Sequence, residues 1–240
     1  MVPARFERYV AIGDSSTEGL DDPDGHGGYR GWSRRLAERL RTAQGALEYH
    51  NFGIRGLKTR QIRDRQLERA LNLRPDLATL FCGTNDLMTL RFDARAVGED
   101  AALMQRELIA RGATVLTFTL PDLSPVMPLA RLIAPRVRAL NAALRDAAAG
   151  SGAFLLDFAA HRVAADPRLW SDDRIHANSD GHARIAEALA HALGLAGATD
   201  AWQRPLAPTA PASWSARARA ELSWMHRHLL PWARRGMGGR

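Results

Sequence analysis

The chain has 240 residues, of which 46% are hydrophobic, enough to form a buried core. Its single cysteine, Cys82, excludes an internal disulfide. The net charge of +7 is uneven, because residues 200–240 hold seven arginines and two acidic residues and so carry +5, which leaves +2 for residues 1–199. The nearly neutral main part argues against a basic surface for nucleic acid, and we expect no nucleic-acid partner.

The N-terminal segment has no apolar stretch long enough for a signal peptide before the first strand-like run. No window elsewhere approaches the roughly 20 apolar residues that a membrane-spanning helix needs. We therefore expect a cytoplasmic protein that does not span a membrane.

Five short apolar runs, several rich in β-branched residues, predict strands along the chain. They are separated by stretches long enough to hold a helix. The runs are "YVAIG" (9–13), "LEYHNFG" (47–53), "DLATLFCG" (76–83), "ATVLTFTLPD" (113–122) and "AFLLDFA" (153–159).

The segments between these runs have the spacing of amphipathic helices, with apolar residues recurring on one face before a glycine typical of a helix end. A less regular helix is predicted over residues 59–71. The last helix of the main part spans 179–193, with Ile185, Leu189 and Leu193 facing inward. The three regular sets are Trp32, Leu36, Leu40 and Ala43 before Gly45; Val97, Ala101, Met104 and Leu108 before Gly112; and Ile133, Val137, Leu140 and Leu144 before Gly150.

Strands that alternate with helices imply right-handed crossovers and a parallel sheet covered on both faces. We therefore predict the α/β class: a three-layer α/β/α sandwich around a five-stranded, mainly parallel sheet. Ligands in such folds bind beyond the carboxyl ends of the strands. Ser15 directly follows the first strand, so it is expected at that edge.

The serine lies in the segment "GDSSTEG", residues 13–19. Thr17 occupies the place of the second glycine in the Gly-x-Ser-x-Gly motif of another hydrolase class, so that motif is excluded. Taken alone, Gly-Asp-Ser is what any tight strand-to-helix turn would use. Ser15 therefore needs partners elsewhere in the chain before it indicates chemistry.

Three other segments supply candidates for such partners. The second strand runs into "NFGIRG", which ends at Gly56, and the third runs into "GTND", which contains Asn85. Near the end of the main part, "DDRIHAN" places Asp173 three residues before His176. A nucleophilic serine needs a base, the base needs a carboxylate to fix its tautomer, and an oxyanion needs donors. Each residue also has a purely structural interpretation, as a turn glycine, a satisfied loop amide or a helix-start histidine.

These four segments, in this order and approximate spacing across residues 8–193, resemble the SGNH hydrolases, also called GDSL-type esterases and lipases. The resemblance implies a flavodoxin-like fold, with Ser15 as nucleophile, His176 as base and Asp173 as the residue that orients it. It also implies an oxyanion hole made by the backbone N–H groups of Ser15 and Gly56 and the side-chain amide of Asn85. The sequence departs from the family's namesake motif at Ser16, where leucine is usual.

The residue types suit these roles independently of the resemblance. A glycine at position 56 adopts positive φ readily and lets the backbone approach a substrate closely. Asn85 is a neutral donor, so it can stabilise an oxyanion without pairing permanently with Asp173. An aspartate and a histidine three residues apart on a short loop can face each other.

Three further features are interpreted as structural. The acidic segment "DDPDGHGG" (21–28) lacks the glutamate that an EF-hand loop needs at its twelfth position, where Ser33 stands, so we expect a solvated loop near the site entrance. Cys82 lies on an apolar strand and is expected to be buried rather than nucleophilic. His226 and His228 form an isolated His-x-His, too sparse for zinc. No metal and no cofactor are therefore expected.

The leading interpretation is a serine hydrolase of carboxylic acyl esters or lipids that works through an acyl-enzyme. A carbohydrate O-deacetylase and a thioesterase use the same chemistry, and the sequence does not separate them. A binding module that keeps this fold without turnover is the alternative from another class.

The C-terminal part is expected to be separate from the catalytic domain, which we assign to residues 1–199. Residues 200–240 read as a linker, "RPLAPTAPAS" (204–213), followed by a basic amphipathic helix within 212–232. This helix can pack on its own domain, on another subunit or on a membrane surface. Its predicted apolar stripe consists of Trp214, Ala218, Leu222, Met225 and Leu229.

Overall fold

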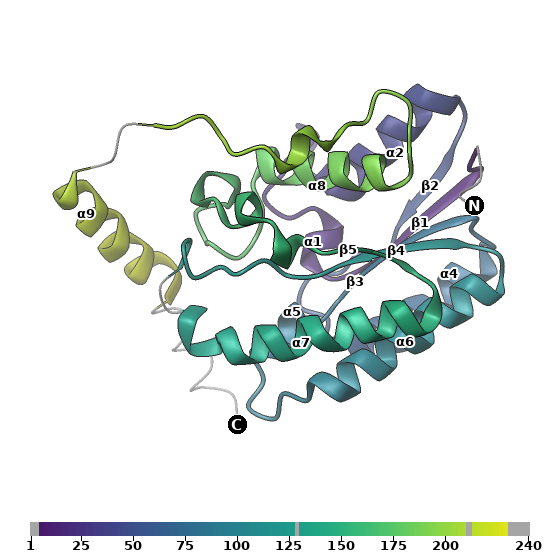
Figure 1. The fold of residues 1–240 in the computed structure, drawn as a ribbon, viewed down its shortest axis with the longest axis horizontal. Coiled ribbons are helices and arrows are strands. Elements are labelled where there is room, and N and C mark those ends of the chain that lie inside the picture. The colour runs from purple at the N-terminus through teal and green to yellow at the C-terminus, as the bar shows by residue number, and fades with distance from the viewer. Residues whose placement is uncertain (1–4, 128–129, 210–212, 230–240) are drawn as a thin grey trace.

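The computed structural model describes residues 5–127, 130–209 and 213–229 and contains one five-stranded, fully parallel sheet (Figure 1). The strand order is β2-β1-β3-β4-β5, so the chain starts near the middle of the sheet and extends it first to one side and then to the other. The strands are β1 (Arg8–Gly13), β2 (Glu48–Asn51), β3 (Leu77–Phe81), β4 (Thr114–Phe118) and β5 (Phe154–Leu156). Four of them lie within the predicted runs, and β1 starts one residue before its run, at Arg8. The parallel pairing confirms the predicted sheet.

Helices cover both faces of the sheet, which confirms the three-layer α/β/α prediction. In Figure 1, α2 and α8 lie together above the sheet, and α6 and α7 lie together below it. The helices are α1 (Ser15–Glu18), α2 (Gly31–Gln44), α3 (Thr59–Ile62), α4 (Glu68–Asn72), α5 (Thr84–Leu87), α6 (Ala94–Ala110), α7 (Ala130–Ser151), α8 (Ser179–Ala192) and α9 (Trp214–Trp224).

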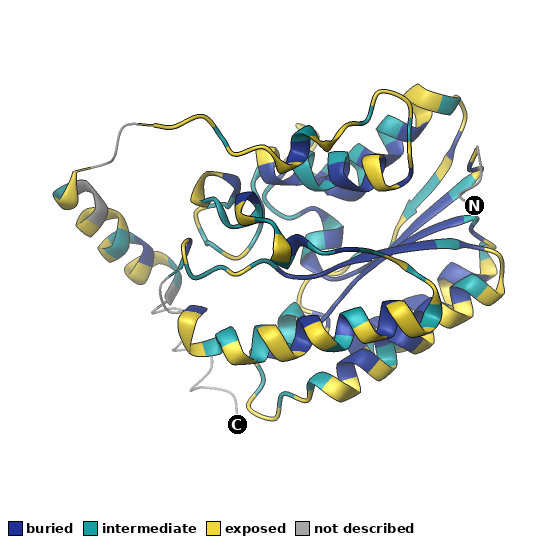
Figure 2. Ribbon diagram, viewed as in Figure 1, coloured by how far each residue is buried: buried dark blue, intermediate teal, exposed yellow. Residues whose placement is uncertain are grey.

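The core lies between the sheet and these helices, as the dark blue strands of Figure 2 show. The central strand β3 is buried along its whole length, which explains why its sequence reads as a continuous apolar run rather than an alternating one. Trp32 of α2 packs edge-on against Phe118 of β4. On α2 the predicted inward stripe holds except at Ala43, which is exposed near the end of the helix.

The irregular spacing over residues 59–71 corresponds to a helix interrupted by a π-helical turn at Arg63–Leu67, between α3 and α4. The turn places the buried side chain of Gln66 against the end of β1. There Gln66 accepts a hydrogen bond from Gly13 N at 2.8 Å and donates one to Gly13 O at 2.9 Å. Such π-turns occur often next to functional sites, and this one fixes the backbone two residues before Ser15.

The loop over residues 21–28 is largely exposed, as predicted for a solvated loop, but it is anchored to the body at Asp22. Asp22 is buried and forms a two-point ion pair with Arg35, with its oxygens 2.7 and 2.9 Å from the guanidinium nitrogens. Asp24 accepts the backbone N–H groups of His26 and Gly28. The acidic residues therefore hold the loop together through the protein's own donors.

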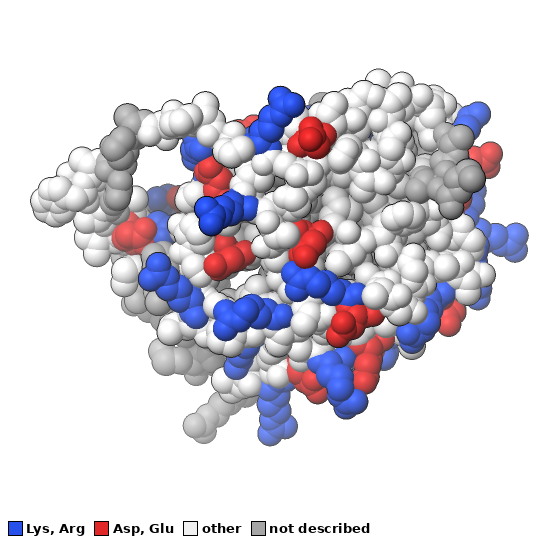
Figure 3. All heavy atoms as spheres, in the orientation of Figure 1, with Lys and Arg blue, Asp and Glu red and all other residues white. Residues whose placement is uncertain are grey.

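The surface facing the viewer in Figure 3 mixes positive and negative side chains rather than separating them. Several form ion pairs, such as Arg63 with Asp100 at 2.5 Å and Arg145 with Asp157 at 2.8 Å. Of the helices that the structure describes, none combines the length and the apolar character required to cross a bilayer.

Residues beyond the predicted boundary at 199 fall into two parts. Trp202, in a 3₁₀ turn at Asp200–Gln203, is buried and meets Phe158 edge-on, so this residue packs with the main core. The helix α9 follows the linker, and the ends of the predicted helix, residue 212 and residues 230–232, lie outside the described residues. Two residues of the predicted stripe, Trp214 and Leu222, are exposed and so do not pack on this chain, whereas Trp224, which is not part of the stripe, is buried.

Candidate active site

Ser15 lies where β1 passes into the short helix α1, at the carboxyl edge of the sheet. Asp14 caps this helix, because its Oδ1 accepts the N–H of Ser16 at 3.0 Å. The turn is also fixed from outside by Gly53, since a Cβ atom there would lie 2.3 Å from Glu18 N. Ser15 is thus held at the start of a helix, with its own N–H outside the helical hydrogen-bond ladder.

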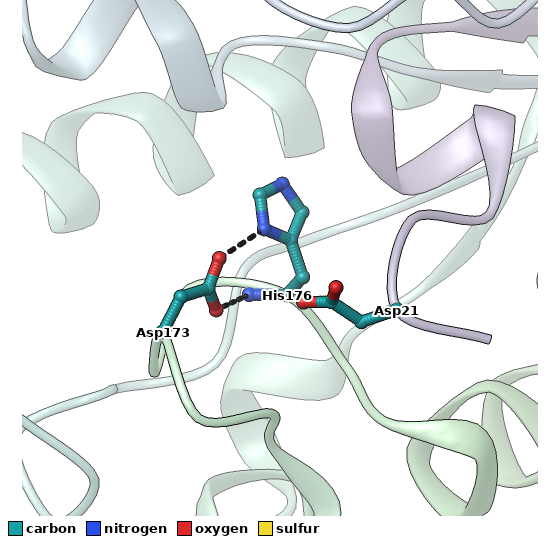
Figure 4. A group of neighbouring side chains, drawn as sticks. All are labelled: Asp21, Asp173 and His176. Atoms are coloured by element: carbon teal, nitrogen blue, oxygen red, sulfur yellow. Dashed lines mark hydrogen bonds and ion pairs between the residues drawn. The ribbon is translucent and has the colours of Figure 1, made fainter. Parts of the chain in front are cut away.

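His176 and Asp173 come to this serine on the loop between Trp170 and α8. Ser15 Oγ lies 2.8 Å from His176 Nε2, and His176 Nδ1 lies 2.6 Å from Asp173 Oδ2. The second carboxylate oxygen of Asp173 accepts the backbone N–H groups of Ile175 and His176, and Figure 4 shows the contacts between Asp173 and His176. The three residues that the sequence proposed for nucleophile, base and orienting carboxylate are therefore hydrogen-bonded in that order.

This arrangement sets the protonation of the histidine ring. With its Nδ1–H donated to Asp173, neutral His176 presents the lone pair of Nε2 to the hydroxyl of Ser15. Burial lowers the pKa of His176, but the hydrogen bond and the charge of Asp173 outweigh it, so the pKa is raised above its usual value of 6.5. Burial raises the pKa of Asp173, yet the contacts with His176 dominate and hold it well below its usual range.

Asp21 is a neighbour of this group that the sequence analysis did not identify. Ser171 Oγ lies 2.6 Å from Asp21 Oδ2 and 2.7 Å from Asp173 Oδ1, so this hydroxyl lies between the two carboxylates and can donate its proton to either. Asp21 approaches from the segment after α1 (Figure 4), and its charge helps to raise the pKa of His176. Ser171 and Asp21 are 150 residues apart in the chain, so local sequence patterns carry no signal for this contact.

Asp21, Asp173 and His176 also form the one group among the described residues whose ligand atoms lie close enough to share a metal ion, within 4.8 Å. The Asp173 and His176 atoms in this group are already engaged with each other and with the loop backbone. His226 and His228 form no such group, and His228 instead lies 3.3 Å from Asp172.

The two other residues proposed as oxyanion donors follow the neighbours of β1 in the sheet. Gly56 follows β2 and Asn85 follows β3, and these two strands lie on either side of β1, which leads to Ser15. Gly56 has φ of 78°, a conformation that glycine adopts without strain. Asn85 Nδ2 donates to Leu57 O at 3.0 Å.

Asp14 is a second acidic neighbour of the site that the sequence did not indicate. It is buried beside Ser15, and Asn85 Nδ2 lies 3.4 Å from its Oδ2. Burial raises the pKa of Asp14 to about 7, against the lowering effect of the Ser16 N–H and of His176. Because the residue lies in a Gly-Asp-Ser segment, the sequence suggested only a residue of a tight strand-to-helix turn.

A pocket of about 90 Å³ opens beside Ser15 and His176, and most of the side chains that line it are apolar. It extends from the serine between the carboxyl ends of β3 and β4 and the 3₁₀ turns that follow β5. Residues that line it include Phe81, Phe118, Leu120, Val163, Ile175 and Trp202. Its walls come from many segments that are far apart in the chain, so no local sequence pattern indicates this pocket.

Cys82 is buried, as predicted, and burial raises the pKa of its thiol far above the usual value. It stands on the strand side of Gly83 and does not line the pocket beside Ser15. A protonated, enclosed thiol is a poor nucleophile.

Residues 11–184 match the GDSL-like lipase/acylhydrolase family. LAE5, an α/β hydrolase enzyme from the metagenome of Lake Arreo in Spain, is similar in structure, with 25% identity and a TM-score of 0.63 over 81% of this chain and 98% of that one. A lipase/acylhydrolase from Enterococcus faecalis has 18% identity and a TM-score of 0.64, over 77% and 94% of the two chains. A mutant of Axe2, an acetylxylan esterase from Geobacillus stearothermophilus, has 18% identity and a TM-score of 0.64, over 86% and 100%. No curated protein matches the chain.

Proposed function

Because the chain belongs to the GDSL-like lipase/acylhydrolase family, we propose that it is a serine ester hydrolase that forms an acyl-enzyme on Ser15. The observation that carries the proposal is the chain of two hydrogen bonds, 2.8 Å from Ser15 to His176 and 2.6 Å from His176 to Asp173. Nucleophile, base and orienting carboxylate are the parts that acyl transfer by a serine needs.

In the proposed reaction Ser15 Oγ attacks the carbonyl carbon of the ester while its proton passes to His176 Nε2. Asp173 stabilises the imidazolium that forms and keeps the ring in place. The C–O bond of the ester then breaks, and His176 returns the proton to the leaving alcohol. Water, activated by the same histidine, attacks the acyl-enzyme and releases the carboxylic acid.

The negative charge on the carbonyl oxygen is assigned to three donors: the backbone N–H groups of Ser15 and Gly56 and the side-chain amide of Asn85. Their positions after three adjacent strands support this assignment. Such donors are effective because they are fixed before the charge develops.

We further propose that the acyl part of the substrate is an apolar chain lodged in the pocket beside Ser15. Leu120, Val163 and Trp202 are among the apolar residues of the pocket wall. Binding of a hydrocarbon chain against this wall is favourable because it removes apolar surface from water. An acetyl group would leave most of this wall unoccupied. The pocket therefore favours an acyl-ester or lipid hydrolase over a carbohydrate O-deacetylase.

The test combines a nucleophile variant, a matched control and a substrate series. Ser15→Ala is expected to abolish hydrolysis of p-nitrophenyl esters and labelling by a fluorophosphonate probe. Ser16→Ala is the control for the nucleophile: Ser16 is the next residue and lines the same pocket, and its hydroxyl accepts a 3.3 Å hydrogen bond from Trp32 Nε1. It should retain both.

Labelling of Ser15→Ala at the wild-type level would overturn the assignment of the nucleophile. Wild-type rates should be measured with p-nitrophenyl esters of increasing chain length, and with acetylated sugars and acyl-CoA. A preference for acetylated sugars would indicate a carbohydrate O-deacetylase, and a preference for acyl-CoA would indicate a thioesterase. Complete absence of turnover and labelling would instead support a binding module.

A further inference from the structure

The C-terminal helix α9 and the turn after it, Met225–Leu229, pack on the loop that carries Asp173 and His176. In Figure 1, α9 lies beyond the linker, at the side of the molecule where the strands end. Trp224 is 6% exposed, whereas Trp214 at the other end of the same helix is 83% exposed. Trp224, at the C-terminal end of the helix, is therefore packed against the body.

The contact with the backbone of the loop is direct. Trp224 Nε1–H donates to the carbonyl oxygen of Asp173 at 3.2 Å. The indole ring lies under the guanidinium of Arg174, whose Cζ is 4.8 Å from the ring centroid. A buried indole N–H that finds an acceptor fixes the position of that acceptor.

Charged pairs flank this contact on both sides. Arg174 is 2.8 Å from Glu221 of α9, and Asp172 is 2.8 Å from Arg227 in the turn after the helix. Three consecutive loop residues, Asp172 to Arg174, are thus each held by the C-terminal segment. His176 lies two residues further along the same loop.

The loop has a conformation that needs such support. Arg174 has φ of 64°, in the left-handed region that residues other than glycine rarely adopt. This residue stands between Asp173 and His176, so its backbone sets the orientation of the two side chains relative to each other. A disfavoured conformation persists only where the surrounding structure holds it.

We propose that Trp224 is a positioning residue for the reaction: by holding the backbone of Asp173 and the side chain of Arg174, it fixes the Asp173–His176 pair in the geometry that Ser15 requires. This inference rests on the proposed serine mechanism. The family match ends at residue 184, so α9 is an element outside the matched segment that completes the site of this chain.

The test uses the full-length protein with Trp224→Ala, Trp224→Phe and, as the matched control, Trp214→Ala. The readouts are kcat, KM and the pH dependence of kcat/KM on a short, soluble p-nitrophenyl ester. Because a loosened Asp173 supports the imidazolium less well, the acid limb of Trp224→Ala should move to lower pH, and kcat should fall by roughly tenfold with little change in KM. Trp224→Phe keeps a ring under Arg174 but loses the N–H donor, so its values should lie between those of Trp224→Ala and the wild type.

Trp214→Ala should behave as the wild type, since its side chain is exposed. Loss of folded protein alone would lower the apparent rate without moving the acid limb, and active-site titration with a fluorophosphonate separates the two effects. An unshifted limb and unchanged kcat per labelled site in Trp224→Phe and Trp224→Ala would overturn the positioning role. A wild-type protein that neither turns over nor labels would instead count against the serine mechanism, so the two failures are distinct.

Discussion

Asn85 Nδ2 lies 3.4 Å from Asp14 Oδ2, so the amide proposed for the oxyanion hole contacts the buried carboxylate next to Ser15. The same amide also donates to Leu57 O, at the shorter distance of 3.0 Å. An oxyanion that forms beside Ser15 can compete for the N–H that points to Asp14, because that contact is long and weak.

This relationship predicts that Asn85→Ala lowers kcat by roughly 10²–10³, the loss typical of removing one oxyanion donor. KM for a short ester should change little, because the amide acts on charge that develops only in the transition state. Steady-state kinetics on a folded variant checks this. If kcat falls by less than about threefold, Asn85 is not a donor of the oxyanion hole.

Asp14 itself predicts an unusual pH dependence of stability. Burial raises its pKa to about 7 in the folded state, from 3.8 when unfolded. The folded protein therefore holds a proton that the unfolded chain has lost between these values, and the stability that this group contributes falls as the pH rises through 7. Asp14→Asn should raise the free energy of unfolding at pH 8, by on the order of 4 kcal/mol at most, and the gain should shrink toward pH 4.

Denaturant unfolding of both proteins at several pH values measures this difference. A gain of the same size at pH 4 and pH 8 would show that it does not come from the titration of Asp14.

The raised pKa of His176 predicts where activity is lost in acid. The base must be neutral, so kcat/KM should fall as the pH is lowered, with the midpoint of this acid limb above pH 6.5. Asp21→Asn removes a nearby negative charge and should move this limb to lower pH while leaving the rate above pH 8 nearly unchanged. Asparagine is a suitable replacement, because it tolerates the φ of 69° at this position and still accepts a hydrogen bond from Ser171.

The matched control for Asp21 is Asp64→Asn, which removes an exposed carboxylate that pairs with Arg63 on the π-turn. Its pH profile should overlay that of the wild type. If Asp21→Asn leaves the limb in place, the charge of Asp21 does not act on the base.

The local parts of the site could be predicted from the sequence, because they lie either just after a strand or close together on one loop. Ser15, Gly56 and Asn85 follow β1, β2 and β3, and Asp173 and His176 are three residues apart on one loop. Parallel strands bring their carboxyl ends together, so the fold alone gathers these positions.

The parts that could not be predicted depend on contacts between distant segments. The π-helical turn that breaks the helix over residues 59–71 places Gln66 in hydrogen-bond contact with Gly13, 53 residues away. On α9 the 3.6-residue period placed Trp214 on the predicted apolar stripe. The tryptophan that contacts the loop is Trp224, which donates a hydrogen bond to Asp173 O and stacks against Arg174. Helical periodicity gives the spacing of side chains and does not say which of them finds a partner.

The apolar pocket should determine which acyl chain lengths the protein hydrolyses. Ala164 lines the pocket on the 3₁₀ turn Arg162–Ala165, and its small side chain leaves space that a phenyl ring would fill. Ala164→Phe should therefore lower kcat/KM for long acyl esters and leave that for an acetyl ester nearly unchanged, since the acetyl group stays close to Ser15.

The measurement is the ratio of kcat/KM for long and short p-nitrophenyl esters in both proteins. We expect the ratio to fall by roughly ten- to a hundredfold, because each methylene excluded from an apolar site costs about 0.8 kcal/mol. Ala159→Phe is the matched control, a change of the same size on the preceding 3₁₀ turn, Phe158–Ala160, at a residue that does not line the pocket. An equal loss on both esters in Ala164→Phe would mean that the substituted ring disturbs Ser15 or His176, whereas an unchanged ratio would place the acyl chain outside this pocket.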